Sequence, residues 1–317
     1  MAHQDHGNIE RIALGSDATA TDPRSLLAGG ESALAPGSLL AGRYHIERFI
    51  AAGGMGEVHA AHDSLLDERV AVKLLRLDLI GKASAQARFA DEIRLARRVT
   101  HRNVCRVFDV GIDGPRVFFT MELHQGETLA SFLERSGPLD VATASPLLSQ
   151  MLAGVAAAHA ADIVHADLKP SNMLMVDGGA RLVLTDFGMA MPCCTHLGCD
   201  CELPHLMGTP AYMAPEQVTG GTMAVTTDVY ALGVILFEMM TGRLPFEGKS
   251  ALAMATARLD RDPPPPRGLR PDLDPRWEET ILACLSREPA LRPPSAAAIA
   301  AALGLERTYQ RVVAPTA

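Results

Sequence analysis

The sequence predicts an α+β fold with two lobes: a small antiparallel β-sheet lobe that carries one helix, then a larger and mainly helical lobe. Short apolar strand patterns fall between residues 44 and 121, whereas helical spacing of apolar residues dominates from residue 129 onward. Strands that precede helices, instead of alternating with them, are typical of α+β proteins. A chain of 317 residues has room for one such unit with tails.

Residues 1–42 are mostly small or polar and show no sustained apolar period. Such a segment buries too little apolar surface to offset the entropy lost on ordering, so we expect a disordered leader. The first strand is expected at 44–50, where apolar and charged residues alternate imperfectly.

A glycine-rich turn follows from Ile50 to Val58. Glycines between two strands let backbone N–H groups close over phosphate oxygens, although such a turn is more often only a β-turn. The apolar strand 70–73 then ends on Lys73. The turn and the lysine together favour a nucleotide-binding lid, while a lone strand lysine would be an exposed edge residue.

One helix of the small lobe is expected between Ala83 and Val99, because Phe89, Ile93 and Ala96 recur at helical spacing. Glu92 lies on the side of this stripe that can face the strand lysine. The alternative interpretation is that Glu92 is a solvated glutamate on the surface. Further strands of a five-stranded sheet are expected at 101–104, 105–110 and 116–121.

The second lobe is expected to begin with a short helix at 129–134 and a longer one that ends near His159. A hairpin is expected from strands 173–176 and 181–184, around the turn Asp177-Gly178-Gly179. Later helices are expected from Asp228, where the sequence is unusually apolar, around Trp277–Leu285 and at 296–303.

The segment His165 to Gly188 concentrates charged and amide side chains: Asp167, Lys169, Asn172 and Asp186. In-line transfer of a phosphoryl group to a hydroxyl needs a carboxylate at the attacking oxygen, a cation on the moving group and oxygen ligands for magnesium. These residues supply those groups in that order. Either half of the segment alone could be a polar loop, but both together, in this order, predict phosphoryl transfer.

The segment resembles the eukaryotic-like protein kinases, whose catalytic loop reads H-R-D-x-K-P-x-N and whose metal-binding turn reads D-F-G. This sequence has Ala166 in place of the arginine and Ala51 in place of the first lid glycine. The Lys169-Pro170-Ser171-Asn172 form is similar to the serine/threonine branch, and the Gly-Met-Gly lid is most similar to bacterial members.

The resemblance also implies which residues form the active site and what each of them does. Lys73 would contact the phosphates with Glu92 as its partner, Asp167 would orient the hydroxyl beside Lys169 and Thr209, and Asn172 and Asp186 would bind Mg or Mn. The ATP-binding residues implied are Ile50, Gly53, Gly54, Met55, Gly56, Val58, Ala71, Lys73, Met121, Glu122, His124 and Leu174. Among these, Met121 would be the gatekeeper, and the Glu122 carbonyl and His124 amide would bond adenine.

The resemblance covers residues 43–305, with a first lobe at 43–122, a second at 123–305 and a short tail at 306–317. It implies that Glu216 pairs with Arg292, and that Asp228 binds the backbone of the catalytic loop. The implied partners are ATP and protein substrates, with autophosphorylation possible.

The formal charge of −8, without a basic cluster, argues against a nucleic-acid partner. The longest apolar run noted, 229–240, falls short of the roughly 20 residues that span a bilayer, and no signal peptide is apparent. We therefore expect no membrane partner and a cytoplasmic location.

Ala166 and Ala51 also motivate a rival function, a catalytically silent scaffold. Because Ala166 replaces an arginine that grips phosphate in many relatives, and Thr195 is the only hydroxyl between Met189 and Met207, we expect activity without loop phosphorylation. The same loop carries Cys193, Cys194, Cys199 and Cys201, with His196 and His205 nearby. These soft ligands could bind zinc, form a thiol switch, or belong to an idle insert.

Overall fold

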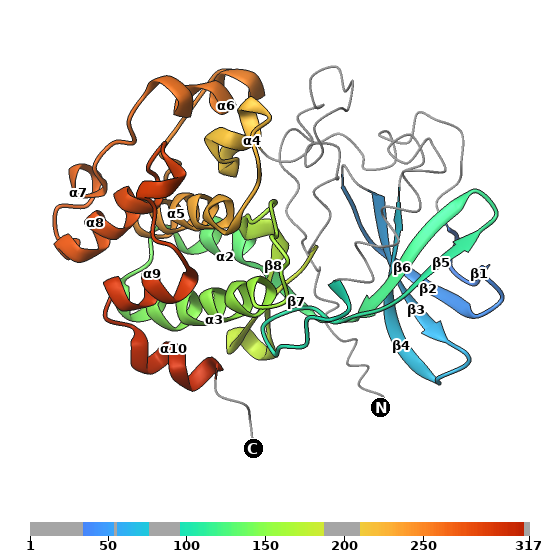
Figure 1. Ribbon diagram of the computed structural model, residues 1–317. Helices are drawn as coiled ribbons and strands as arrows, with labels where there is room; N and C mark the ends of the chain where they lie inside the picture. Colours follow the sequence, from blue (N-terminus) through green and yellow to red (C-terminus); the bar gives the residue numbers. More distant parts are fainter. Residues whose placement is uncertain (1–33, 54–55, 76–95, 187–209, 314–317) are drawn as a thin grey trace, which may run out of the picture.

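The computed structural model describes residues 34–53, 56–75, 96–186 and 210–313. Two lobes lie side by side, with a curled β-sheet in one and most of the helices in the other (Figure 1). The two-lobed α+β fold is therefore confirmed. The predicted helix between Ala83 and Val99 lies almost entirely outside the described residues.

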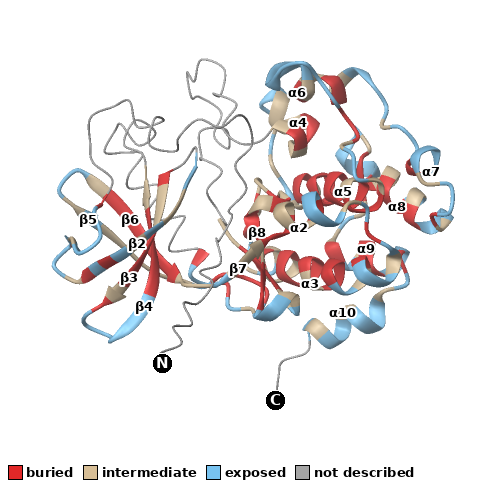
Figure 2. Ribbon diagram, turned by 180° about the vertical axis from the view of Figure 1, so that it is seen from behind, coloured by how far each residue is buried: buried red, intermediate tan, exposed pale blue. Residues whose placement is uncertain are grey.

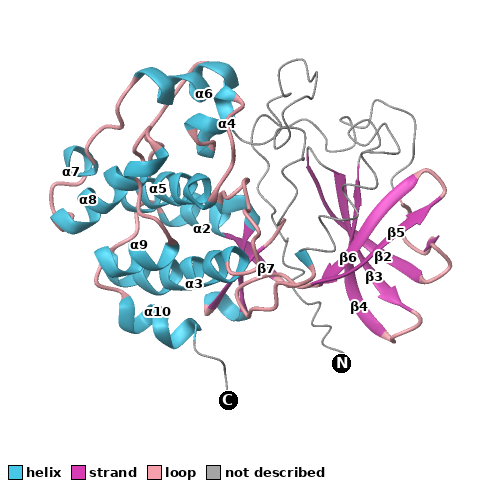
Figure 3. Ribbon diagram, viewed as in Figure 1, coloured by secondary structure: helices cyan, strands magenta, loops and turns pink. Residues whose placement is uncertain are grey.

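The small lobe is built on one antiparallel sheet with strand order β1-β2-β3-β4-β6-β5. Its six strands are β1 (Leu39–Leu40), β2 (Tyr44–Gly53), β3 (Gly56–Asp63), β4 (Glu68–Leu75), β5 (Val107–Asp113) and β6 (Arg116–Glu122). A second sheet, in the order β7-β8-β9, lies where the two lobes meet (Figure 3). Its strands are β7 (Gly126–Thr128), β8 (Met173–Val176) and β9 (Arg181–Leu184).

The described helices all follow the small lobe. They are α2 (Leu129–Ser136), α3 (Val141–His159), α4 (Pro215–Thr219), α5 (Val225–Thr241), α6 (Ala251–Asp260), α7 (Pro266–Leu269), α8 (Pro275–Cys284), α9 (Ala296–Ala302) and α10 (Glu306–Val313). Short 3-10 turns occur at Pro170–Asn172, Asp177–Gly179, Pro210–Tyr212 and Pro289–Leu291. The predicted hairpin of β8 and β9 is confirmed, with Met173 opposite Leu184 and Val176 opposite Arg181.

The start of the described chain differs from the expected disordered leader. Leu34 and Leu40 are buried in an apolar cluster with Val70, Val72 and Phe118, and β1 adds a sixth strand beside β2. The five-stranded prediction is therefore wrong by one strand. Two separated leucines gave no periodic pattern. The segment is ordered by burial of these leucines against the folded sheet and by backbone bonds such as that from the Gly37 N–H to the Ile46 carbonyl at 2.8 Å.

One other local prediction is also wrong. Residues 101–104 form a turn, in which Val104 makes a single bridge to Leu184, and the next strand begins only at Val107. The expected tail after residue 305 contains α10, which packs against α3 and α9 through the half-buried Tyr309. Its other side chains are too exposed to give a strong core pattern (Figure 2).

The core of the large lobe is built around α3 and α5 (Figure 2). Of the 17 residues of α5, 13 are buried, as expected for a helix that is apolar on all sides. Among the described residues, α3 is the one helix long and apolar enough to cross a membrane, in place of the run at 229–240. It packs against β9, α5, α9 and α10, so its apolar character is accounted for by the core.

Candidate active site

The loop between α3 and β8 brings three of the predicted catalytic side chains into contact. Lys169 Nζ lies 3.0 Å from Asp167 Oδ2. Asn172 Nδ2 donates to the same carboxylate oxygen at 3.0 Å and to the Asp167 carbonyl at 2.9 Å. The Asp167 carboxylate is thus held in one orientation by a cation and an amide, and it stays partly exposed, at 17%.

A buried carboxylate fixes the backbone of this loop. The backbone N–H groups of His165 and Ala166 each donate to Asp228 at 2.8 Å, and His159 Nε2 lies 2.7 Å from the same carboxylate. The expected contact between Asp228 and the loop is therefore confirmed. Ala166 adopts φ 60°, a left-handed conformation that costs a non-glycine residue about 1–3 kcal/mol. The Asp228 bond to its N–H helps to hold it there.

His165 connects the catalytic loop to the end of β9. Its Nε2 lies 2.9 Å from the Thr185 carbonyl, which can only accept a hydrogen bond, so Nε2 carries the proton. The Nδ1 atom then accepts from the Asp167 N–H at 3.3 Å. Thr185 also donates its N–H to the Asn172 carbonyl at 2.9 Å. These bonds place Asp186, the next residue, beside the catalytic loop.

Asp186 joins the two lobes through a charged contact. Lys73 Nζ, on β4 of the small lobe, lies 2.7 Å from Asp186 Oδ1, and Lys73 is 5% exposed. Burial alone would raise the pKa of the Asp186 carboxyl, but the charge and hydrogen bond of Lys73 hold it below its ordinary value of 3.8. Asp186 is therefore ionised at neutral pH.

Asn172 and Asp186 have the chemistry of magnesium ligands. The bonds that Asn172 makes to Asp167 use its amide nitrogen, and its amide oxygen and the Asp186 carboxylate are hard donors of the kind Mg²⁺ prefers. The residues present therefore fit this ion.

Four predicted adenine-binding side chains lie in one apolar cluster that spans both lobes. Val58 on β3, Ala71 on β4 and Met121 on β6 come from the small lobe, and Leu174 on β8 comes from the large lobe. Ala71 faces Met121 directly in the strand register. Each would be unremarkable in a core, but together they line the junction of the lobes.

The remaining nucleotide residues are distributed along the lid and the connection between the lobes. Ile50 and Gly53 lie on β2, Glu122 ends β6 and His124 follows it. The Glu122 carbonyl accepts a weak bond from Cys105 Sγ at 3.6 Å. Gly56 has φ 148°, and a Cβ there would lie 1.8 Å from the Leu74 carbonyl oxygen. The close approach of β4 therefore requires glycine at this position, independently of any phosphate.

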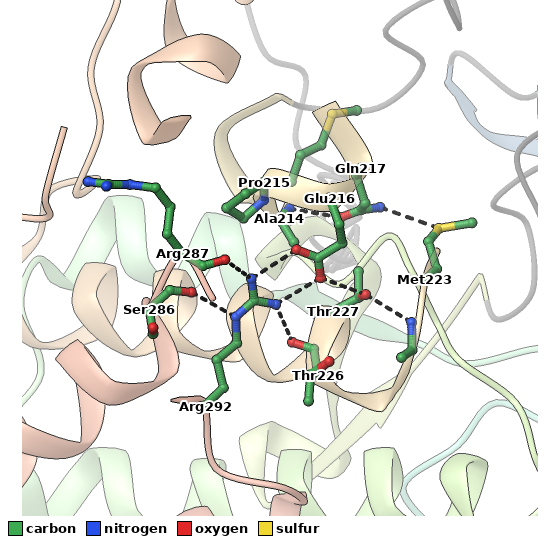
Figure 4. Close-up of polar contacts among 12 residues, drawn as sticks. Ala214, Pro215, Glu216, Gln217, Met223, Thr226, Thr227, Ser286, Arg287 and Arg292 are labelled. Carbon is green, nitrogen blue, oxygen red and sulfur yellow. Dashed lines mark hydrogen bonds and ion pairs between the residues drawn. The ribbon is translucent and has the colours of Figure 1, made fainter. Parts of the chain in front are cut away.

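The predicted pair of Glu216 and Arg292 is confirmed (Figure 4). Arg292 Nη1 and Nη2 donate to the two Glu216 oxygens at 2.8 and 2.9 Å, and Thr227 donates to Glu216 Oε1 at 2.8 Å. Arg292 also donates to the carbonyls of Thr226, Ser286 and Arg287. Burial would raise the pKa of Glu216, but the bond from Arg292 holds it below its ordinary value. The pair anchors α4 to the segment between α8 and α9.

Several predicted site residues lie outside the described residues. They are Glu92, Thr209, Gly54, Met55, Cys193, Cys194, Cys199 and Cys201. Within the described part of the chain, no group of three or more His, Cys, Asp or Glu side chains could hold a metal ion.

Two further side chains, which the sequence does not mark, hold the catalytic loop and its neighbours. Gln217 Nε2 donates to the Ala166 carbonyl at 2.7 Å, so α4 is bonded to the residue before Asp167. Tyr212 donates its hydroxyl to Glu238 at 2.6 Å. Glutamine and tyrosine at such positions give no periodic or chemical signal, because one of these contacts ends on a backbone carbonyl and the other joins residues far apart in the sequence.

Comparison with known families decides the wider assignment. A family model described as "Protein kinase domain" matches residues 44–302. The chain belongs to the protein kinase family. The expected resemblance is therefore confirmed, and the match covers nearly all the described residues of both lobes.

Curated relatives of this kinase are bacterial serine/threonine-protein kinases. It is 38% identical over 281 residues to pkn3 of Myxococcus xanthus, covering 84% of this chain and 50% of that protein. It is 35% identical over 256 residues to PrkC of Bacillus subtilis (strain 168), covering 80% and 39%. It is 37% identical over 285 residues to PknA of Mycobacterium tuberculosis (strain H37Rv), covering 88% and 65%. The chain thus spans 39–65% of the length of these relatives.

A crystal structure of the Mycobacterium tuberculosis PknI kinase domain shares the fold of this kinase. The TM-score is 0.70 at 24% sequence identity, and the match covers 86% of this chain and 100% of that domain.

Proposed function

We propose that this kinase transfers the γ-phosphoryl group of Mg-ATP to serine or threonine hydroxyls of proteins, itself included. The contact between Lys73 of one lobe and Asp186 of the other carries this proposal, because it brings a phosphate-binding cation beside the Asp167 cluster. Phosphoryl transfer depends almost entirely on positioning and on neutralising charge. The site offers both.

Each side chain then has a defined task. Asp167, whose carboxylate is oriented by Lys169 and Asn172, accepts the hydrogen bond of the acceptor hydroxyl and takes its proton. The acceptor oxygen forms the new bond to the γ-phosphorus while the bond from that phosphorus to the β–γ bridging oxygen breaks, and ADP leaves. Lys73 and Lys169 neutralise charge on the phosphate oxygens. Magnesium, when held by Asn172 and Asp186, supplies further charge neutralisation. Val58, Ala71 and Leu174 offer apolar contacts to the adenine ring, and Met121 closes the back of its site.

The scaffold function is disfavoured by the way Ala166 is held. Its N–H is bonded to Asp228 and its carbonyl to Gln217, so the loop geometry does not depend on an arginine side chain. Every charged position that the chemistry requires is filled. If the purified chain neither bound ATP nor transferred phosphate, the scaffold function would be favoured and the proposal contradicted.

The direct test identifies the labelled amino acid. The purified chain, γ-labelled ATP, magnesium and a generic basic protein should give labelled phosphoserine or phosphothreonine after acid hydrolysis of the acceptor. Label that appears only on tyrosine, or no label above that of an Asp186→Asn chain, would contradict the proposed activity.

The cytoplasmic location stays a prediction.

Activity should not depend on phosphorylation of the loop 189–207. We expect a Thr195→Ala chain to keep its turnover within about twofold, because without an arginine at position 166 a phosphothreonine loses the charge partner that would order the loop. Initial rates with and without prior treatment by a phosphatase provide the measurement. A large loss of rate in Thr195→Ala, or after the phosphatase, would contradict this expectation.

For the loop cysteines we keep three hypotheses: a zinc site, a thiol switch and an idle insert. Metal analysis of protein purified without a histidine tag separates them. Stoichiometric zinc that is lost when Cys193, Cys194, Cys199 and Cys201 become serine indicates the first, with lower activity after chelation because metal binding is coupled to local folding. Activity that responds to oxidant and thiol reductant, but not to chelator, indicates the second. No response to any of these treatments indicates the idle insert.

The two cysteines in the described part of the chain will not obscure that experiment. Cys105 and Cys284 are both buried, burial raises the pKa of the Cys105 thiol, and it raises that of Cys284 to about 12. Because the thiolate is the reactive form, both should be inert to thiol reagents in the folded chain at neutral pH.

A further inference from the structure

The large lobe contains a buried arginine that the proposed chemistry does not use. Arg258 lies on α6 and is 1% exposed. No carboxylate of the described residues forms an ion pair with its guanidinium, and its Nε has no hydrogen-bond partner there. Arg292, which is also buried, has Glu216 beside it. Burying an unpaired charge is costly, so the contacts that Arg258 does make need an explanation.

Those contacts converge on one short segment of backbone. Arg258 Nη1 donates to the Met213 carbonyl, and Nη2 donates to the Ala211 carbonyl at 3.1 Å. Nη2 also donates to the Met254 carbonyl, one turn earlier on α6, at 3.2 Å. The guanidinium carbon lies 5.7 Å from the centre of the Phe246 ring. The side chain is therefore fixed by its own helix and by an aromatic face, while it holds residues 211–213 with two bonds.

The same segment forms the wall beside the catalytic carboxylate. Tyr212 and Met213 line a small cavity together with Ala166 and Asp167 of the catalytic loop and Gln217 of α4. On this side the segment is bonded through Gln217, whose Oε1 accepts from the Ala214 N–H at 2.9 Å. Tyr212 and Met213 therefore lie close to Asp167, the residue to which the acceptor hydroxyl would be presented.

We propose that Arg258 is a positioning residue for the protein acceptor: it fixes the backbone of residues 211–213, and so the wall against which the acceptor lies beside Asp167. This inference rests on the proposed function. Arginine suits the task because its planar fork reaches two carbonyls at once, which a single ammonium group does not match. Burial lowers the pKa of Arg258 from its ordinary value of 12.5.

The test compares Arg258→Met with Arg258→Lys, and uses Arg261→Met as a matched control. Arg261 follows the same helix and is exposed. For Arg258→Met we expect kcat/KM for the basic protein acceptor to fall about tenfold or more, while KM for ATP changes less than twofold. Arg258→Lys should recover part of the loss, and Arg261→Met should behave like the unmodified chain.

Hydrogen exchange provides a readout independent of turnover. In Arg258→Met, the amides of residues 211–214 should exchange faster, while those of the catalytic loop should not. If Arg258→Met does not fold, Arg258→Lys carries the same test with a smaller expected effect.

An active chain whose Arg258 variants keep kcat/KM for the acceptor, or lose ATP and acceptor binding equally, would overturn the role of Arg258 alone. A purely structural role would lower the melting temperature without changing the kinetics of the folded enzyme, and it would overturn the inference as well. An unmodified chain that transfers no phosphoryl group would instead overturn the proposed function, and the acceptor role with it.

Discussion

Lys73→Met, Asp167→Asn and Asp186→Asn are each expected to lower phosphoryl transfer by about a hundredfold or more. Each substitution removes one charge from a site where charge neutralisation and positioning supply nearly all of the catalysis. Lys73 and Asp186 also hold each other at 2.7 Å, so loss of either leaves the other charge without this partner. Steady-state rates of label transfer from ATP to a basic protein provide the measurement.

Asp177→Asn is the matched control for the two aspartate variants. Asp177 lies in the turn between β8 and β9, its side chain is 62% exposed, and it pairs with Arg181 at 2.8 Å. The same chemical change there should leave the rate nearly unaltered. Turnover close to that of the unmodified chain in all three site variants would show that the active site is assigned to the wrong residues.

Arg292→Met is expected to lower the free energy of unfolding by about 3–5 kcal/mol, the cost typical of breaking a buried ion pair from one side. The change leaves the Glu216 side chain, which is only 11% exposed, without its cationic partner and also removes bonds to the carbonyls of Thr226 and Ser286. Urea unfolding of the two chains measures the difference. Arg135→Met is the control, because Arg135 is 60% exposed and its partner Glu127 is only half-buried.

The Glu216–Arg292 pair should also make the stability of the folded chain depend on pH. Because the folded pKa of Glu216 is held below its ordinary value of 4.5, the unfolded chain binds more protons there as the pH falls. The stability that Glu216 contributes is therefore complete above about pH 4.5 and is lost as the pH falls through the folded pKa. Arg292→Met should weaken this acid dependence.

An Arg292→Met chain with the same free energy of unfolding as the unmodified chain would contradict the anchoring role of the pair.

The sequence predicted best what chemistry or local geometry requires. Asp167, Lys169 and Asn172 could be identified together because phosphoryl transfer needs those groups, and the structure brings their side chains into contact. The β8–β9 hairpin could be predicted with its turn because Asp177-Gly178-Gly179 is a strong turn signal between two apolar runs. Both signals are contained in short stretches of chain.

The features that were missed depend on contacts between distant residues. β1 exists because Leu40 is covered by the folded sheet, and a two-residue strand has no pattern of its own. The sequence of residues 101–104 predicted a strand, but of these residues only Val104 forms a β-bridge, to Leu184 of β9. Gln217 and Arg258 act on backbone carbonyls, which every residue offers, so nothing in the sequence marks their targets.

We propose that the Lys73–Asp186 contact and the Asp167 cluster act together as one site for phosphoryl transfer. The most direct measurement follows label from γ-labelled ATP into a basic protein over time, for the unmodified chain with magnesium, the same chain with a chelator, and the Asp186→Asn chain. We expect steady transfer in the first reaction and at least about a hundredfold less in the other two. Equal label in all three reactions, or none in the first, would contradict it.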